Sequence, residues 1–280
     1  MEYLESRRAR VEERLETVLD RVEPPHLAEQ VRHVALSGGK RVRPTVTVLV
    51  CEAAGGRPED AVDYAVGIEL VHNASLVIDD IIDESDLRRG VASAWSRFGY
   101  GSAIIASDGL LGEAFELFSP EQRAMQAVAE SMVELGEGEA TELVSRPTTE
   151  AEYMDLARRK TGALFRAAAE LGAIAADSDP LTVEAFGDYA ERVGVAFQIR
   201  DDVLDATADA DDLGKPTGQD AAMGRPSVVQ ITDLTPAEAN ERAREQSDAA
   251  LDALVTADVG DSQAMEYLRD LAEFVVVRER

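Results

Sequence analysis

Two aspartate clusters of the form Asp-Asp-x-x-Asp lie far apart in the chain, each among apolar residues with helical spacing. They comprise Asp79, Asp80 and Asp83 in the first cluster and Asp201, Asp202 and Asp205 in the second. Residues four apart share one face of a helix, about 6 Å apart along its axis. Asp79 and Asp83 therefore point one way, and so do Asp201 and Asp205. Two such faces turned toward each other offer the hard oxygen ligands that suit Mg²⁺ bridged to substrate phosphates.

Cationic residues accompany both clusters. The segment 38–44, Gly-Gly-Lys-Arg-Val-Arg-Pro, places Lys40 and Arg43 in a glycine-containing loop that leads into a helix N-terminus. Amide groups and the helix dipole there add to the attraction for phosphate. Arginine also presents a planar fork of donors that matches phosphate oxygens. Further cations close to the clusters are Arg88, Arg89, Lys160 and Lys215.

Simpler interpretations exist for each residue taken alone. One aspartate cluster is more typical of a solvated helix face, and His72 alone is more typical of a core histidine. Two clusters flanked by Leu and Val and followed by cations favour a Mg²⁺–diphosphate site. Glu69 and His72 also form the ExxH pattern of di-iron proteins, but that fold needs two such motifs on different helices. The other match, Glu23 to His26, contains two prolines and cannot be helical.

The charge of the chain is extreme. It has 55 Asp and Glu against 28 Lys and Arg, giving a net charge of −27. A nucleic-acid backbone would be repelled, so nucleic-acid binding is disfavoured as the main activity. An acidic surface with few lysines suggests adaptation to high salt, which screens self-repulsion. Equal stability by circular dichroism in low and in molar KCl would contradict this halophilic interpretation.

Helical periodicity dominates the sequence. Prolines and glycines punctuate it, and no stretch alternates with period two for long enough to predict a sheet. Connections are short, so we expect one all-α domain over residues 1–280. The expected helices cover residues 4–22, 27–36, 44–54, 58–86, 101–118, 120–144, 149–176, 180–207, 235–256 and 261–277.

Three features predict a cytoplasmic protein. The chain has no run of 18 uncharged apolar residues, so no transmembrane segment is expected. Its first residues lack the apolar core of a signal peptide. Cys51 is the only cysteine and lies in an apolar run, so a buried, inert thiol is expected rather than a nucleophile or a disulfide.

The ordered motifs resemble those of the trans-isoprenyl diphosphate synthases, or polyprenyl synthetases. The likeness runs from about Gly38 to the C-terminus and is greatest to a geranylgeranyl diphosphate synthase of a salt-adapted archaeon. It implies an isoprenoid-synthase helical bundle around a central cavity, and a homodimer. The motifs that carry it are residues 38–44, Glu69 to His72, Asp79 to Asp83 with Arg88-Arg89-Gly90, Lys160-Thr161, Phe197 to Asp205, and Gly214-Lys215-Pro216.

The resemblance implies a head-to-tail condensation of isopentenyl diphosphate with an allylic diphosphate (dimethylallyl, geranyl or farnesyl). The allylic diphosphate would ionise to a carbocation with help from three Mg²⁺ ions. The implied metal ligands are Asp79, Asp80, Asp83, Asp201, Asp202 and Asp205. The implied binding residues for the allylic diphosphate are Arg88, Lys160, Gln198 and Lys215, and Thr161 and Arg225 are implied substrate-binding residues as well. Those for isopentenyl diphosphate are Lys40, Arg43, His72 and Arg89. Implied direct participants in catalysis are Asp79, Asp83, Asp201, Lys160 and Lys215.

Three positions depart from the family pattern. Ile78 replaces a usual histidine, Glu139 replaces a usual glutamine, and Arg225 replaces a usual lysine. None of them is an implied metal ligand. Glu139 would add a negative charge near the metals, which would affect the fine tuning of the site rather than the presence of activity.

In this family, residues upstream of the first cluster set the product length. Ala74 and Ser75 are small, and Val71 on the next turn is medium-sized, so a product of geranylgeranyl length or longer is expected. Phe115 or Phe118 on a facing helix could still block a longer chain. Farnesol as the only dephosphorylated product would contradict the expectation.

Other functions fit the same motifs. One is a farnesyl diphosphate synthase. Another is a terpene cyclase or head-to-head synthase on the same scaffold, which would not need the cations expected to bind isopentenyl diphosphate. A third is a non-catalytic subunit of a hetero-oligomeric synthase, although such subunits tend to lose aspartates that both clusters here retain.

Overall fold

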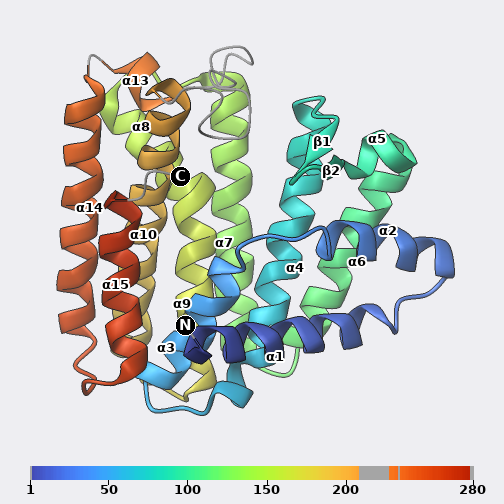
Figure 1. Ribbon diagram of the computed structural model, residues 1–280, viewed down its shortest axis with the longest axis horizontal. Helices are drawn as coiled ribbons and strands as arrows, with labels where there is room; N and C mark the ends of the chain where they lie inside the picture. Colours follow the sequence, from blue (N-terminus) through green and yellow to red (C-terminus); the bar gives the residue numbers. More distant parts are fainter. Residues whose placement is uncertain (1, 208–226, 233, 278–280) are drawn as a thin grey trace.

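Helices build almost all of the structure, so the expected all-α fold is confirmed (Figure 1). The computed structural model describes residues 2–207, 227–232 and 234–277. Its helices are α1 (Glu2–Leu19), α2 (Pro25–Ala35), α3 (Val42–Ala53), α4 (Pro58–Ile82), α5 (Ala94–Phe98), α6 (Tyr100–Phe118), α7 (Gln122–Ala140), α8 (Glu150–Ala157), α9 (Ala163–Ala175), α10 (Pro180–Thr207), α13 (Val228–Ile231), α14 (Pro236–Thr256) and α15 (Gln263–Val277). The predicted helices therefore exist, with boundaries shifted by a few residues.

The start of α3 differs from its prediction. The helix begins at Val42, so Pro44 occupies its first turn rather than its first position. Proline is tolerated there because the first four amide groups of a helix have no partner within the helix. Arg41, just before α3, has a left-handed backbone (φ 52°). This turn sends the chain from the glycine loop into the bundle.

The segment after the first aspartate cluster is a hairpin, which corrects the expectation that the helix continues to residue 86. Helix α4 ends at Ile82, and strands β1 (Leu87–Arg88) and β2 (Val91–Ala92) pair antiparallel. Arg89 and Gly90 between them both have positive φ, at 52° and 81°. Two central residues of this kind form the tight turn that matches the twist of paired strands. The hairpin thereby fixes Arg88 and Arg89 beyond the end of α4.

Two π-helical segments interrupt the middle of the chain. Segment η1 (Thr141–Ser145) follows α7, and η2 (Arg158–Gly162) joins α8 to α9. The sequence predicts a helix over residues 149–176 whose apolar pattern is broken at Lys160-Thr161, and the structure widens the helix there. Segments of this type are rare and frequently occur at functional sites.

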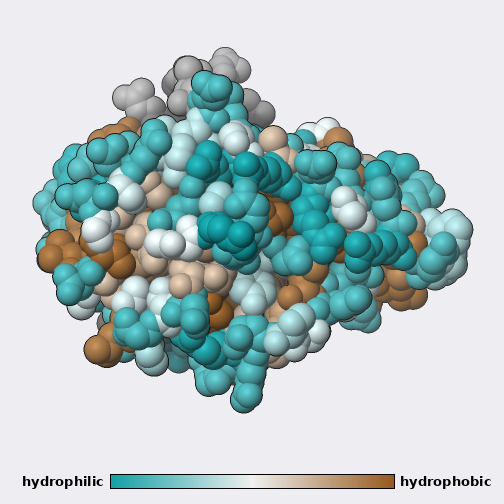
Figure 2. Space-filling view, turned by 90° about the horizontal axis from the view of Figure 1, so that it is seen from below, coloured by the Kyte–Doolittle hydropathy of each residue, from teal (hydrophilic) through white to brown (hydrophobic). Residues whose placement is uncertain are grey.

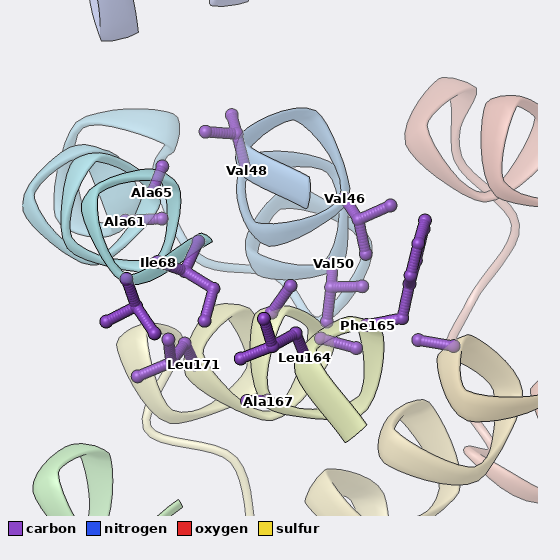
Figure 3. Packing of buried hydrophobic residues seen from close by; sticks show 14 of the residues in the cluster. Val46, Val48, Val50, Ala61, Ala65, Ile68, Leu164, Phe165, Ala167 and Leu171 are labelled. Carbon is purple, nitrogen blue, oxygen red and sulfur yellow. The ribbon is translucent and has the colours of Figure 1, made fainter. Parts of the chain in front are cut away.

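Helix α9 lies at the centre of the bundle. Most of its residues are buried, and it packs against α3, α4 and α10 (Figure 3). Gly172 lets α3 and α9 approach closely, since a Cβ atom there would lie 2.3 Å from the carbonyl oxygen of Thr47. One continuous cluster of buried apolar side chains includes residues from α1 to α15. This core holds α4 and α10, the helices that carry the two aspartate clusters.

The surface is predominantly hydrophilic on the face seen in Figure 2, with small separate apolar patches. Within the described residues, no helix is both long enough and apolar enough to cross a membrane. Cys51 is buried, as expected, and burial raises the pKa of its thiol to about 12.

Candidate active site

A cavity of about 400 Å³ lies between α4, α7, α9 and α10. Asp79 from the first cluster and Asp201 from the second both line it. They are 122 residues apart in sequence (201 − 79), and the bundle brings them to one hollow. Apolar side chains line another part of the same cavity, among them Leu76, Leu135, Leu164 and Phe197. The cavity therefore combines acidic groups with space for a hydrocarbon chain.

Asp80 and Asp202, which directly follow Asp79 and Asp201, both accept hydrogen bonds from other groups of the protein. Asp80 is buried, and its Oδ1 accepts hydrogen bonds from the Nε (2.9 Å) and Nη2 atoms of Arg88. Asp202 lines the cavity, but its carboxylate accepts from Gln198 Nε2 (2.7 Å), the Tyr153 hydroxyl (2.7 Å) and the Val228 amide (2.9 Å). Successive residues of a helix point about 100° apart, which separates each pair.

The last aspartate of each cluster lies outside the cavity lining. Asp83 is half-buried and caps the end of α4, and Asp205 is buried on α10. Each is one turn beyond the inward-facing aspartate of its cluster.

A cationic group occupies the cavity wall formed by the loop before α3, the first turn of α3, α4 and the hairpin. It contains Lys40, Arg43, His72, Arg88 and Arg89, all of which line the cavity. Arg43 Nη1 lies 3.3 Å from His72 Nε2, and its guanidinium lies 4.5 Å from the centre of the Phe165 ring. Arg43 Nε is buried without a hydrogen-bond partner. Burial lowers the pKa of Arg43 to about 10, which still leaves it charged at neutral pH.

Arg89 and His72 are fitted into this group differently. Arg89 Nη1 donates to the carbonyl oxygen of Gly38 and to Asn73 Oδ1 (3.3 Å), so the hairpin is tied to the glycine loop. Burial, followed by the charges of Arg43, Arg89, Arg88 and Arg41, lowers the pKa of His72 well below 6.5. His72 is therefore neutral at pH 7 and contributes a ring nitrogen rather than a charge.

This neutral histidine gives a prediction for acid stability. The unfolded chain would protonate His72 near pH 6.5, whereas the folded chain resists protonation, so stability falls as the pH drops below that value. The slope from this residue is at most about 1.4 kcal/mol per pH unit. His72→Asn should remove that part of the slope in urea unfolding between about pH 7 and pH 5. His26→Asn, on the exposed side of α2, is the control, and equal slopes for wild type and His72→Asn would contradict the prediction.

A buried ion pair that the sequence analysis did not assign supports the cationic group. Arg41 Nη1 lies 2.6 Å from Glu69 Oε1, and both side chains are 3% exposed. Arg41 Nη2 also donates to the carbonyl oxygen of Ala35 (2.7 Å). The pair joins the loop before α3 to α4, which positions Lys40 and Arg43. The available sequence signal was a glutamate between Ile68 and Leu70 in an apolar run.

Lys160 forms the third charged part of the cavity. Its ammonium pairs with Glu142 and lies 3.3 Å from Glu139 Oε1. Burial alone would lower the pKa of Lys160, but Glu142, Glu139 and Asp79 together raise it to about 12. Burial and the charge of Asp79 raise the pKa of Glu139 to about 7. Glu142 lines the cavity and was not predicted from the sequence.

A short hydrogen-bond chain connects the predicted residues of η2 and α10. The Thr161 hydroxyl donates to Gln198 Oε1 (2.7 Å), and Gln198 Nε2 donates to Asp202. This chain orients the Gln198 amide at the cavity wall. Lys215 and Arg225, which were predicted to bind substrate, lie outside the described residues.

The residues predicted to set product length occupy different environments. Ser75 lines the cavity, whereas Ala74 and Val71 are fully buried. The carbonyl oxygen of Ala74 accepts a hydrogen bond from Ser107 on α6 (3.1 Å), which marks the α4–α6 contact.

The side chains that line the cavity suit a divalent cation whose coordination shell is completed by oxygen atoms of the substrate. Within the described residues, no group of three acidic, histidine or cysteine side chains is placed to hold a metal alone. Mg²⁺ typically takes one or two carboxylates and completes its shell with water and substrate phosphates. Asp79 on α4 and Asp201 on α10, which line the same cavity, match that requirement.

Comparison with known proteins gives consistent matches over the whole chain. The Polyprenyl synthetase family model matches residues 24–270. A short chain isoprenyl diphosphate synthase of Methanothermobacter thermautotrophicus is 36% identical over 87% of this chain and 78% of its own length. A geranylgeranyl pyrophosphate synthetase structure from Geoglobus acetivorans superposes with a TM-score of 0.87 at 32% identity, covering 99% of this chain and 98% of that one.

A second solved structure contains ligands. It is a polyprenyl synthase from Caulobacter crescentus complexed with calcium and isoprenyl diphosphate, with a TM-score of 0.84, 28% identity, and coverage of 100% of this chain and 97% of that one. Sequence motifs, fold and cavity agree with these comparisons. The chain therefore belongs to the polyprenyl synthetase family and is an enzyme of the isoprenyl diphosphate synthase type.

Proposed function

We propose that this enzyme condenses isopentenyl diphosphate with an allylic diphosphate, in a Mg²⁺-dependent reaction, to give geranylgeranyl diphosphate or a longer product. The observation that carries the proposal is the single cavity lined by Asp79, Asp201 and two separate sets of cations. One set contains Lys40, Arg43 and Arg89, and the other contains Arg88 and Lys160. Two diphosphates can thus bind in one cavity, with the hydrocarbon of each toward the apolar side chains.

The residues of the allylic half would hold the leaving group. The two aspartate clusters would hold Mg²⁺ ions, three per site, which when bound would supply Lewis-acid neutralisation of the leaving allylic diphosphate. Asp79 and Asp201 supply the inward-facing ligands, with Asp83 and Asp205 one turn beyond them. Asp80 holds Arg88 in place, and Asp202 holds Gln198 in place. These two aspartates would therefore support the site by positioning its side chains rather than by binding the metal. Arg88, Lys160, Thr161 and Gln198 line the same cavity and would stabilise the growing charge of the departing diphosphate.

The second half of the cavity would hold isopentenyl diphosphate. Lys40, Arg43 and Arg89 contact its diphosphate, and neutral His72 donates or accepts beside it. The double bond then attacks the allylic cation, the new C–C bond forms, and a proton leaves to the released diphosphate. No nucleophilic side chain is required.

A single assay tests this function. Purified protein with Mg²⁺, isopentenyl diphosphate and geranyl or farnesyl diphosphate should form a longer prenyl diphosphate, and EDTA should abolish the reaction. Product formation without isopentenyl diphosphate would instead identify a cyclase. No turnover by the purified chain, with both substrates and metal present, would favour a non-catalytic subunit.

We propose that Phe118 limits the product length. Its ring is fully buried and covers Gly67 on α4, where a Cβ atom would lie 2.4 Å from Phe118 Cζ. Gly67 is seven residues before Ala74, about 10 Å further from the aspartates along α4. A prenyl chain that grows along the α4–α6 contact past Ala74 would therefore meet this ring.

Phe118→Leu and Phe118→Ala should lengthen the product by at least one isoprene unit, as read by chromatography after dephosphorylation. The leucine variant is included because removing a buried aromatic ring costs about 3–5 kcal/mol of stability. Val133→Ala is the control, since its side chain on α7 is 62% exposed. An unchanged product from folded Phe118 variants, or an equal shift in the control, would contradict this role.

We also propose that the enzyme is a homodimer. Helix α6 exposes Ile104, Ile105 and Phe115, and the adjacent α4 exposes Ile78 and Ile82. Such an apolar face is typical of an interface between subunits. Light scattering should give the mass of two chains, and Ile104→Glu should shift it toward one. A monomeric wild type at micromolar concentration would contradict the proposal.

A further inference from the structure

A second hollow adjoins the active-site cavity. It has a volume of about 490 Å³ and lies between α1, α3 and α15. Figure 1 shows the start of α1 beside these two helices, and Tyr3 stacks on Tyr267 with ring centres 5.2 Å apart. This volume is within the range of small-molecule sites, which are mostly apolar with a few polar groups. We call the hollow the α1–α15 groove; its apolar walls are Leu4, Val42, Leu49, Tyr267, Leu271 and Phe274.

The groove is continuous with the predicted isopentenyl diphosphate site. Lys40 and Val42 line both the groove and the active-site cavity. From Val42 the groove follows α3 to Leu49, a distance of about 10 Å along the helix axis. One end of the groove therefore opens at the N-terminus of α3, where the helix dipole favours an anion.

The charges at the rim indicate the orientation of a ligand. Lys40 forms no ion pair with the part of the chain that the structure describes, and its side chain is exposed. The sequence contains three lysines, at positions 40, 160 and 215, so a free ammonium group is scarce in this chain of net charge −27. Arg8 on the rim donates to Glu12 (3.1 Å) and to the Gly39 carbonyl (3.3 Å). Glu5 and Asp270 also lie on the rim, from α1 and α15, which leaves the Lys40 end for an anion.

We propose that the α1–α15 groove binds a prenyl diphosphate at a second site, with its hydrocarbon in the groove and its diphosphate at Lys40. The ligand is an amphiphile with an apolar chain and a strongly anionic head, which matches the walls and the end of the groove. Binding there requires no metal, because no aspartate of the two clusters lines the groove. The diphosphate would occupy Lys40, so the long-chain product would compete with isopentenyl diphosphate. This last step rests on the proposed function, whereas the binding itself does not.

Titration calorimetry with geranylgeranyl diphosphate in EDTA tests the site on the full chain. EDTA removes metal-dependent binding at the aspartates, so saturable binding of one ligand per chain is expected in the groove. Leu271→Ser and Phe274→Ser should each weaken it at least tenfold. Phe274 is 59% exposed, so its replacement should leave the fold intact. Val255→Ser, which changes an 80% exposed residue on α14, is the matched control and should bind as wild type does.

Kinetics then test the competition. Geranylgeranyl diphosphate should raise the apparent KM for isopentenyl diphosphate, and Phe274→Ser should relieve this inhibition with kcat unchanged. Absence of saturable binding in EDTA, or binding that both groove variants leave intact, would overturn the second site. If the purified chain has no synthase activity but still binds geranylgeranyl diphosphate in the groove, the proposed function is wrong and the second binding site is retained.

Discussion

Asp79→Ala and Asp201→Ala are each expected to lower kcat/KM for prenyl transfer by about 10³-fold or more. Each removes one of the two carboxylates that line the cavity from different helices, so the leaving diphosphate would lose part of the neutralisation it needs to depart. A factor of this size corresponds to about 4 kcal/mol of transition-state stabilisation. The measurement is initial rates at saturating Mg²⁺ with both substrates varied.

Two comparisons make this result specific. Asp248→Ala removes an exposed carboxylate on α14 and should retain wild-type kcat/KM. Both active-site variants should also keep the wild-type circular dichroism spectrum, since neither aspartate belongs to the buried apolar core. Retention of more than about a tenth of kcat/KM by either variant would show that its carboxylate is not needed to hold the diphosphate.

Glu69→Leu is expected to destabilise the fold by about 3–5 kcal/mol. The substitution leaves Arg41 buried without the carboxylate that lies 2.6 Å from its guanidinium, and desolvation of an uncompensated charge is costly. The loop before α3 would lose its attachment to α4, so the KM for isopentenyl diphosphate should also rise. Urea unfolding gives the stability and steady-state kinetics gives the KM.

The double variant Arg41→Met with Glu69→Leu distinguishes a missing charge partner from damaged packing. Replacing both ions by apolar side chains of similar size is often neutral for stability. The double variant should therefore recover most of the stability lost in Glu69→Leu. If it is as unstable as the single variant, the loss comes from packing around Glu69 and the ion pair has no special role.

The helices could be predicted from the sequence because apolar periodicity, prolines and caps all mark them. Thr235, for example, begins α14 with a reciprocal capping box to Glu238. The β1–β2 hairpin could not be predicted from strand patterns, because its strands have two residues each and no alternation to recognise. The π-helical widening at Lys160 was also missed, since it depends on contacts with α7 and α10 rather than on local propensity.

The site could be predicted to the level of residue types and motifs, but not to the level of orientation. Helix geometry already separates Asp201 from Asp202, yet the donors that occupy Asp202 come from Tyr153 and from the amide of Val228, both distant in sequence. The pairing of Lys160 with Glu142 likewise depends on how α7 meets η2. Contacts of this kind arise from tertiary packing, and no local pattern in the sequence specifies them.

Binding of a non-ionisable allylic analogue, dimethylallyl S-thiolodiphosphate, tests the central claim most directly. Calorimetry with and without Mg²⁺ should show tight binding only when the metal is present, and Asp79→Ala and Asp201→Ala should each abolish that metal-dependent gain. Metal-dependent binding that survives loss of either carboxylate, or tight binding without metal, would contradict the account.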